Sequence, residues 1–314
     1  MARIAVLLIC AAVLAGVFSP VLRAAGEEDP AALAAAVDAS IAAIRKVTLS
    51  AEKAIVDARA RYDELPDEAK ALVKKLPDLE KAERTLQTLK DKAAAAEIKK
   101  LSDARKYEEA VALGEEYIAG RELSSVRGNV VKYILLSYAR RGNAMIKAGL
   151  CEEAEAYLLA CRDRYAEADT ADLDRAIAAL KKAVAEPESG AVLNTGAKGE
   201  YGAVTVRAGD APAVIKLVSA SDESRCLVFY VRAGETATAH IKDGVYHMRY
   251  ATGGKWYGER EMFGSSTVCY AVDGPLQFST DRVNNDVFSQ RYEYTLHAAP
   301  EGASAAAPLA VEAF

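Results

Sequence analysis

The stretch Cys226–Gly264, CLVFYVRAGETATAHIKDGVYHMRYATGGKWYGEREMFG, decides the fold of the C-terminal part of the chain. Short runs of β-branched and aromatic residues alternate in it with Gly and Asp, which is the pattern of strands separated by turns. Runs of the same kind precede and follow it, at the spacing of roughly ten residues that is typical of a β-sandwich. We therefore expect residues 203–314 to form an all-β sandwich domain.

One turn in this stretch predicts a specific pairing of strands. Asp243-Gly244 is a strong signal for a two-residue hairpin turn. A hairpin through it would place His240 directly opposite His247 on the solvent face, with Cβ atoms about 5 Å apart. The two histidines are the candidate metal ligands or acid–base pair. Because basic side chains lie beside them and no carboxylate or thiol is expected on that face, we favour a solvated pair and expect no cofactor. The residues expected on the buried face are Ala237, Ala239, Ile241, Tyr246, Met248 and Tyr250.

Three aromatic residues, Tyr250, Trp256 and Tyr257, are the candidate ligand-binding residues. Trp256 is the only tryptophan of the chain and lies in an expected loop beside Gly253-Gly254. Aromatic side chains on a loop can form a platform for a glycan or for a partner chain. Large aromatic residues are usually mostly buried, so we favour the alternative that Trp256 closes the end of the core.

The first residues are typical of a secretory signal peptide. One Arg precedes the apolar run Ile4–Phe18, and small residues follow up to an expected cleavage site near Ala25. The run is short for a membrane span of roughly 20 residues, and an uncleaved anchor is the alternative. We therefore expect residues 1–25 to be a signal peptide and the protein to be extracytoplasmic, either secreted or associated with the cell envelope.

Four cysteines follow the expected signal peptide, in a compartment that permits disulfides. Cys151 and Cys161 fall on one expected helix, roughly 15 Å apart, which is too far for a disulfide. Cys226 and Cys269 both fall in the strand-rich region. A disulfide between them and two buried thiols are the two alternatives.

Residues 26–91 have the apolar spacing of amphipathic helices. Within them the spacing A-R-x-x-Y-x-x-L, then K-x-x-V, then L-x-x-A-E, resembles a helical module of bacterial surface proteins. The resemblance covers roughly residues 48–90 and implies a non-catalytic spacer. The matching residues are Ala58, Arg59, Tyr62, Leu65, Lys70, Val73, Leu79, Ala82 and Glu83.

Within residues 92–187, the segment YARRGNAMIKAGLCEEAEAYLLAC at Tyr138–Cys161 has Gly142 where two helices would cross and Gly149 at the turn. In this it resembles a tetratricopeptide-type helical hairpin, and it is the better of two copies. Helices cross closely only where small residues face each other. A weaker copy precedes it, with an insertion at Arg121–Val131. Because a peptide groove normally needs about three repeats, a structural helical bundle is favoured over a peptide-binding groove.

Residues 188–202 are rich in glycine and polar residues and form the expected linker to the β-domain. The region after them contains FYVRAGETA (Phe229–Ala237), DGVYHMRYATGGKWYGE (Asp243–Glu259) and Phe263-Gly264. With these motifs it resembles a domain of secreted and membrane-anchored proteins of Gram-positive bacteria, often joined to tetratricopeptide repeats. It implies a β-domain with no assigned reaction.

Charge and motifs narrow the expected function. A net charge of -5 and a pI near 5.5 argue against a nucleic-acid partner. The sequence has no glycine-rich phosphate loop, HExxH motif, CxxC pair or serine nucleophile elbow, so we do not expect an enzyme.

Taken together, the sequence predicts an α+β multidomain protein, all-α in front and an all-β sandwich behind. We expect it to dock or scaffold envelope or secreted proteins without catalysis. The first alternative is a cell-wall glycan-binding module that uses the Trp256 loop, and the second, least favoured, is a cell-wall enzyme. Membrane association is expected only if the N-terminal segment is uncleaved.

Overall fold

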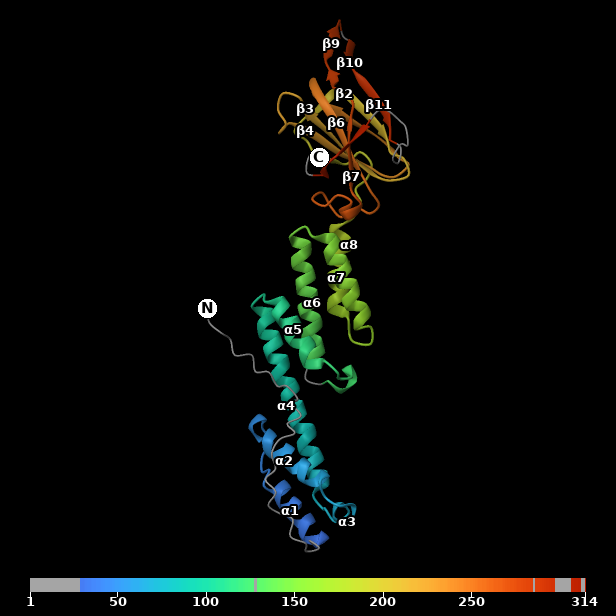
Figure 1. The fold of residues 1–314 in the computed structure, drawn as a ribbon. Helices are drawn as coiled ribbons and strands as arrows, with labels where there is room; N and C mark the ends of the chain where they lie inside the picture. The colour runs from blue at the N-terminus through green and yellow to red at the C-terminus, as the bar shows by residue number, and fades with distance from the viewer. Residues whose placement is uncertain (1–28, 127–128, 285, 297–305, 312–313) are drawn as a thin grey trace. The chain divides into compact units, whose positions relative to one another are not determined.

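The computed structural model describes residues 29–126, 129–284, 286–296, 306–311 and 314 (Figure 1). Helices occupy the chain up to Ala183 and strands follow from Val192, so the α+β class is confirmed. The chain divides into two compact units, residues 1–90 and 91–314, at the predicted end of the first helical module. The predicted signal peptide lies outside the described residues. None of the helices within them is long and apolar enough to cross a membrane.

In the first unit, α1 (Pro30–Ala42), α2 (Glu52–Asp63) and α3 (Asp67–Lys70) pack with the beginning of α4 (Leu76–Asp103). Two residues of the surface-module spacing hold α2 to α4 in this unit. Arg59 donates from Nε and Nη2 to the two carboxylate oxygens of Glu83, both at 2.7 Å. Such a two-pronged pair fixes the direction of both side chains, which gives this part of the spacing a structural reason.

The second unit begins with the end of α4, which is followed by α5 (Tyr107–Ile118), α6 (Val130–Lys147), α7 (Cys151–Arg164) and α8 (Ala171–Ala183). Helix α6 packs against α5, α7 and α8. A Cβ atom at Gly142 would lie 2.5 Å from Leu158 Cδ2, so α6 and α7 cross closely where the sequence predicted it. A Cβ atom at Gly114 would lie 2.4 Å from Ile134 Cγ1, and this second close crossing was not predicted.

The strands of the described residues are β1 (Val192–Asn194), β2 (Lys198–Arg207), β3 (Ala213–Ser219), β4 (Cys226–Val231), β5 (Thr236–Ile241), β6 (Gly244–Thr252), β7 (Val268–Val272), β8 (Leu276–Phe278), β9 (Thr280–Val283), β10 (Asp286–Ser289), β11 (Arg291–Thr295) and β12 (Ala306–Leu309). These strands form three sheets. One has seven strands in the order β1-β4-β3-β6-β7-β12, with β8 also paired to β6; the second is β11-β2-β5, and the third is the hairpin β10-β9. The first two sheets contribute alternate residues to one hydrophobic cluster.

The predicted hairpin through Asp243-Gly244 is wrong. Strand β5 pairs with β2, whereas β6 pairs with β3, β7 and β8, so the turn carries the chain from one sheet to another. The predicted faces are nevertheless correct. All six residues expected on the apolar face are buried in the shared cluster, because two-residue alternation determines the face of a strand and says nothing of its neighbour.

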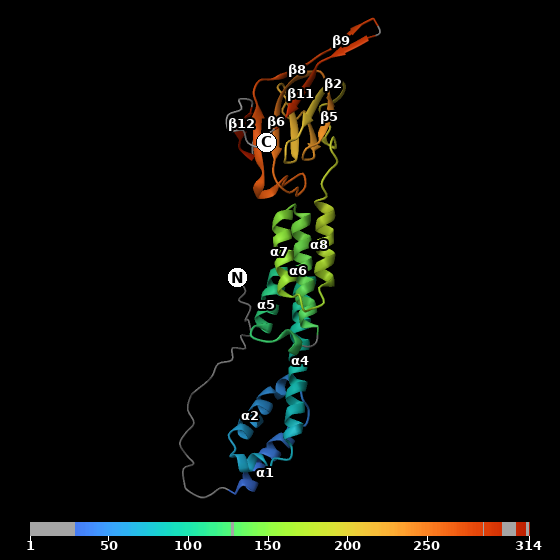
Figure 2. The ribbon, with the colours of Figure 1, turned by 90° about the vertical axis from the view of Figure 1, so that its right-hand side faces the viewer.

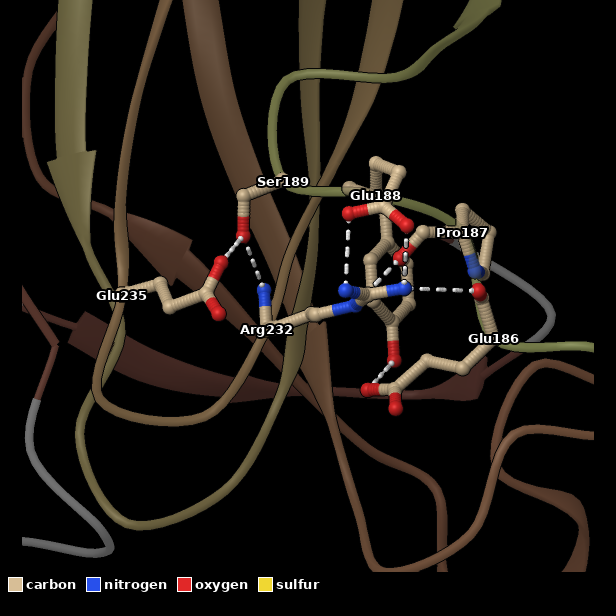
Figure 3. Close-up of polar contacts among 7 residues, drawn as sticks. Glu186, Pro187, Glu188, Ser189, Arg232 and Glu235 are labelled. Atoms are coloured by element: carbon tan, nitrogen blue, oxygen red, sulfur yellow. Dashed lines mark hydrogen bonds and ion pairs between the residues drawn. The ribbon is translucent and has the colours of Figure 1, made fainter.

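The predicted linker is largely ordered structure. Residues 188–202 include β1 and the first half of β2. Arg232 fastens the segment that precedes β1, as Figure 3 shows: its backbone N–H donates to Ser189 Oγ at 2.9 Å and its Nε to the Pro187 carbonyl oxygen at 2.9 Å. Its Nη1 also donates to Glu188 Oε2 at 2.7 Å. Gly190 and Gly196 lie in turns, and Gly199 and Gly202 lie in the bulged start of β2, so the glycine content marked turns and a bulge and not a loose connection.

Cys226 and Cys269 are two buried thiols, as in the second of the two alternatives. Cys226 lies on β4 and Cys269 on β7, and both are buried without a disulfide. Strands β3 and β6 lie between β4 and β7, which separates the two by about 14 Å at the usual strand spacing. That distance is about twice the reach of a disulfide.

Candidate functional site

The two candidate histidines do not form a pair. His240 on β5 stands opposite Ala203 of β2, and His247 on β6 stands opposite Val218 of β3, so they belong to different sheets. Both side chains are exposed, as predicted. Among the described residues, no group of three or more His, Cys, Asp and Glu side chains could hold a metal ion.

The three candidate aromatic residues also lie apart. Tyr250 stacks on Tyr270 with ring centroids 4.9 Å apart, inside the cluster shared by the two sheets. Trp256 is only 5% exposed and packs edge-on against Tyr230 and Phe263, at centroid distances of 5.0 and 5.7 Å. Neither ring is available as a platform for a glycan.

Trp256 is buried as a core residue, but not in the core that was predicted. Its cluster contains Val214, Tyr230 and Ala251. These residues alternate along β3, β4 and β6 with members of the shared cluster, so they point to the opposite face of the seven-stranded sheet. The loop that carries Trp256, residues 253–267, therefore covers the outer face of that sheet. We call this segment the WYGE loop.

The WYGE loop contacts the turn between α6 and α7 through complementary charges. Glu261 accepts hydrogen bonds from the backbone N–H groups of Cys151 and Glu152, the latter at 3.3 Å. Helix α7 has no side-chain cap of its own, because its N-cap residue is Leu150. The carboxylate thus supplies the missing acceptor and faces the positive end of the helix dipole.

Arg260, next to that carboxylate, serves the other helix end. Its Nη1 donates to the carbonyl oxygen of Ala148, the C-cap residue of α6. A guanidinium at the negative end of a helix is favourable for the same reason that a carboxylate is favourable at the positive end. Two adjacent loop residues therefore satisfy both helix termini of one turn.

Further contacts join the WYGE loop to α7, and we call them, together with those of Glu261 and Arg260, the junction. Glu152 accepts from the backbone N–H and the Oγ of Ser265, at 2.7 and 2.6 Å. Gly264 has a φ of 58°, and a Cβ atom there would lie 2.5 Å from Glu152 Oε2. A glycine at this position of the Phe263-Gly264 motif therefore adopts the left-handed conformation and admits the Glu152 carboxylate without strain.

Tyr257, the third candidate ligand residue, is also part of the junction. Its hydroxyl donates to Glu155 Oε2 at 3.0 Å, and Lys255 contacts the other oxygen of the same carboxylate. Burial and the hydrogen bond to Glu155 raise the pKa of Tyr257 to about 12. Burial acts to raise the pKa of Glu155, but the hydrogen bonds from Lys255 and Tyr257 outweigh it and lower that pKa below its usual value. The motif that looked like a binding loop is thus an intramolecular contact.

A different feature, the β9–β10 hairpin, was missed by the sequence reasoning. It forms a two-stranded sheet of its own and leads away from the other strands of the domain (Figure 2). Three of its apolar side chains are open to solvent: Val283 is 55% exposed, Val287 40% and Phe288 58%. The pair Asn284-Asn285 between the strands was the available signal, since Asn favours tight hairpin turns, and Asn284 has a φ of 58°.

A groove of about 970 Å³ lies at the base of this hairpin. On one side, β2 bulges outward between Lys198 and Gly202, both of which stand opposite Ile241 of β5. The bulge exposes Tyr201, and Arg282 of β9 lies over its ring at 5.7 Å. The residues that line the groove are Lys198, Gly199, Glu200, Tyr201, Ile241, Lys242, Asp243, Thr280, Asp281 and Arg282.

Two of the buried thiols, Cys151 and Cys161, lack the surroundings of a nucleophile. Burial and the nearby Glu115 raise the pKa of Cys161 to about 12, and burial with Glu261 raises that of Cys151. A catalytic cysteine requires the opposite shift.

Comparison with known proteins adds no further assignment. No protein-family model, curated protein or solved structure matches the chain.

Proposed function

We propose that this chain is a non-catalytic docking or scaffold protein of the cell envelope, and that the β9–β10 hairpin is its contact surface. In this proposal the helical part, with its tetratricopeptide-like hairpins, carries a C-terminal β-sandwich that presents the hairpin. The signal-like pattern of the N-terminal residues supports a location outside the cytoplasm, secreted or attached to the envelope.

The exposed hairpin is the observation that carries the proposal. Exposed apolar side chains that gather on one projecting element are typical of interaction sites, whereas single ones scattered over a surface are not. Val283, Val287 and Phe288 gather on a single hairpin of eight strand residues, and Tyr201 at its base is 36% exposed. Burying such side chains in a partner would provide a favourable free energy of association.

The WYGE loop supports the same function in a second way. Because Glu261 and Arg260 satisfy the ends of α7 and α6, the domain that carries the hairpin is tied to the helices by charged contacts. These contacts limit the motion of the domain relative to the helices, so less of that freedom is lost when a partner binds. A scaffold protein benefits directly from this property.

The glycan-binding alternative is weaker. It depended on Tyr250, Trp256 and Tyr257, whose rings are stacked, buried and bound to Glu155 respectively. Tyr201 is the aromatic side chain at the groove, and Arg282 lies over its ring. A cell-wall enzyme remains the least favoured alternative.

The test compares protein binding with glycan binding by the same full-length chain. Tagged protein is incubated with purified peptidoglycan and, separately, with a detergent extract of envelope proteins. We expect specific, saturable capture from the protein extract and no co-sedimentation with peptidoglycan above a bovine albumin control. Saturable binding to peptidoglycan with no protein captured would reverse the order of the two functions.

A further inference from the structure

The two faces of the β9–β10 hairpin differ in charge. The register pairs Asp286 with Val283 and Phe288 with Asp281, and cross-strand partners share a face. One face of the hairpin, which we call its outer face, therefore carries two apolar side chains, Val283 and Phe288, and two carboxylates, Asp281 and Asp286. The other face, with Arg282 opposite Val287, carries one apolar side chain and one cation.

We propose that the hairpin is clasped on both faces by a cleft of a partner protein, with an apolar wall rimmed by Lys or Arg against the outer face. The proposal rests on the docking function above and names the chemistry of the partner. Three observations support it: apolar exposure on both faces, two carboxylates without a cation on one of them, and a groove at the base of the hairpin that is bordered by Arg282 of the other face as well as by Asp281.

Exposure on both faces argues for a clasp and against a flat contact. Phe288 and Val283 are 58% and 55% exposed on the outer face, while Val287 is 40% exposed on the face beside Arg282. A flat partner surface would cover one of these sets and leave the other in water. An isolated two-stranded hairpin is also only marginally stable, so a partner that covers both faces would stabilise it most.

The charges of the outer face determine the character of the wall that covers it. Asp281 and Asp286 are both exposed, and neither forms an ion pair with any residue that the structure describes. A basic rim would complement both carboxylates and guide the approach of the partner. Across the hairpin, Arg282 donates to Tyr201 Oη at 3.3 Å and borders the groove, into which the second wall of the cleft would extend.

Two other occupants fit less well. Two copies of the chain joined through their outer faces would bring four carboxylates together, and like charges across an interface oppose association. A lipid bilayer would have to accept Asp281 and Asp286 beside the inserting Phe288, and the negative surface of an anionic membrane would repel them.

The test places a photoreactive benzoylphenylalanine in the full-length protein at Val283, Val287 or Phe288, one position at a time. Val268 is a matched control, since it is 46% exposed on β7, away from the hairpin. Each variant is irradiated in the envelope extract, and cross-linked peptides are identified by mass spectrometry. A second set carries the double substitution Asp281→Lys and Asp286→Lys.

We expect one partner protein to be captured from all three hairpin positions and not from position 268. Peptides cross-linked from positions 283 and 288 should flank Lys or Arg residues of the partner, and position 287 should reach a different segment of the same protein. The double substitution should reduce capture at least tenfold.

Several results would overturn the clasp. They are capture from one face alone, capture unaffected by the charge reversal, cross-links to a second copy of the chain, and cross-links to lipid. If no position captures protein but the wild type still binds the extract, the hairpin is not the contact and docking survives elsewhere. If the wild type binds no protein at all, the docking function itself fails.

Discussion

The contact between Glu261 and the start of α7 can be tested by Glu261→Ala. The substitution removes the acceptor of two backbone N–H groups at a helix end that has no other side-chain cap. Loss of an N-cap acceptor costs typically about 1 kcal/mol, and loss of a carboxylate at a helix N-terminus about 0.3–1 kcal/mol. We therefore expect the free energy of unfolding to fall by about 1–2 kcal/mol.

Trp256 makes this change measurable, because it is the only tryptophan and lies in the WYGE loop itself. Urea unfolding followed by tryptophan fluorescence reports the junction and the β-domain around it. The second unit spans residues 91–314, and for a unit of this size about 1 kcal/mol corresponds to roughly 2–4 °C in Tm. Glu261→Ala should thus lower Tm by about 2–8 °C.

Two further variants separate the contribution of the hydrogen-bond acceptor of Glu261 from that of its charge. Glu259→Ala is the matched control, since Glu259 is exposed on the same loop, and its effect should stay within about 0.5 kcal/mol. Glu261→Gln keeps an acceptor and removes the charge, so it should lose only the dipole part, about 0.3–1 kcal/mol. Equal stability of Glu261→Ala and Glu259→Ala would refute the capping role.

Three other predictions concern a close backbone approach, the Glu155 contact and a buried thiol. Gly199→Ala should destabilise the protein by more than about 2 kcal/mol, because a Cβ atom there would lie 2.2 Å from the Ile241 carbonyl carbon. Gly254→Ala is the control: a Cβ atom there would meet only Ser266 Oγ, at 3.7 Å, so thermal melts should show little change in Tm. The folded-state pKa of Glu155 is lowered, so its stabilising contribution should be present above its unfolded pKa of about 4.3 and be lost as the pH falls below that value. Lys255→Met should reduce this pH-dependent loss of stability, measured by urea titrations at pH 3–7. The same pH profile in Lys255→Met and in the wild type would contradict this role of Glu155. With its pKa raised to about 12 and its side chain buried, Cys161 should resist iodoacetamide at pH 8 until the protein unfolds, as mass spectrometry would show.

The helical part was the easier part to predict. Apolar spacing of three and four residues identifies a helix and its buried side, and Gly142 marked a real crossing because no side chain fits against Leu158 there. In the strand region, the alternation of apolar and polar residues predicted the buried side but not the pairing of the strands. Ala239 and Tyr246 were correctly placed on the buried side. Because both sheets bury this side in one cluster, the alternation could not reveal that β5 and β6 pair with different strands.

The Asp243-Gly244 turn led to the wrong prediction of a β5–β6 hairpin for a chemical reason. Asp and Gly favour any tight turn, and here the Asp243 carboxylate accepts from the N–H and Oγ1 of Thr280, at 3.0 and 2.8 Å. It anchors β9 at a crossing between sheets. The WYGE loop could not be interpreted from sequence either, because its acceptors and donors on α6 and α7 are about 110 residues away in the chain. The hairpin was missed because its strands are only four residues long.

The most direct test of the docking account is the effect of Phe288→Ser on binding to envelope proteins. Phe288 is 58% exposed, so its replacement should leave the fold and Tm unchanged, as should Val268→Ser at a similarly exposed site on β7. Biolayer interferometry against the immobilised extract then compares the two variants with the wild type. We expect at least tenfold weaker binding by Phe288→Ser alone, whereas equal binding by all three proteins would exclude the hairpin as the contact surface.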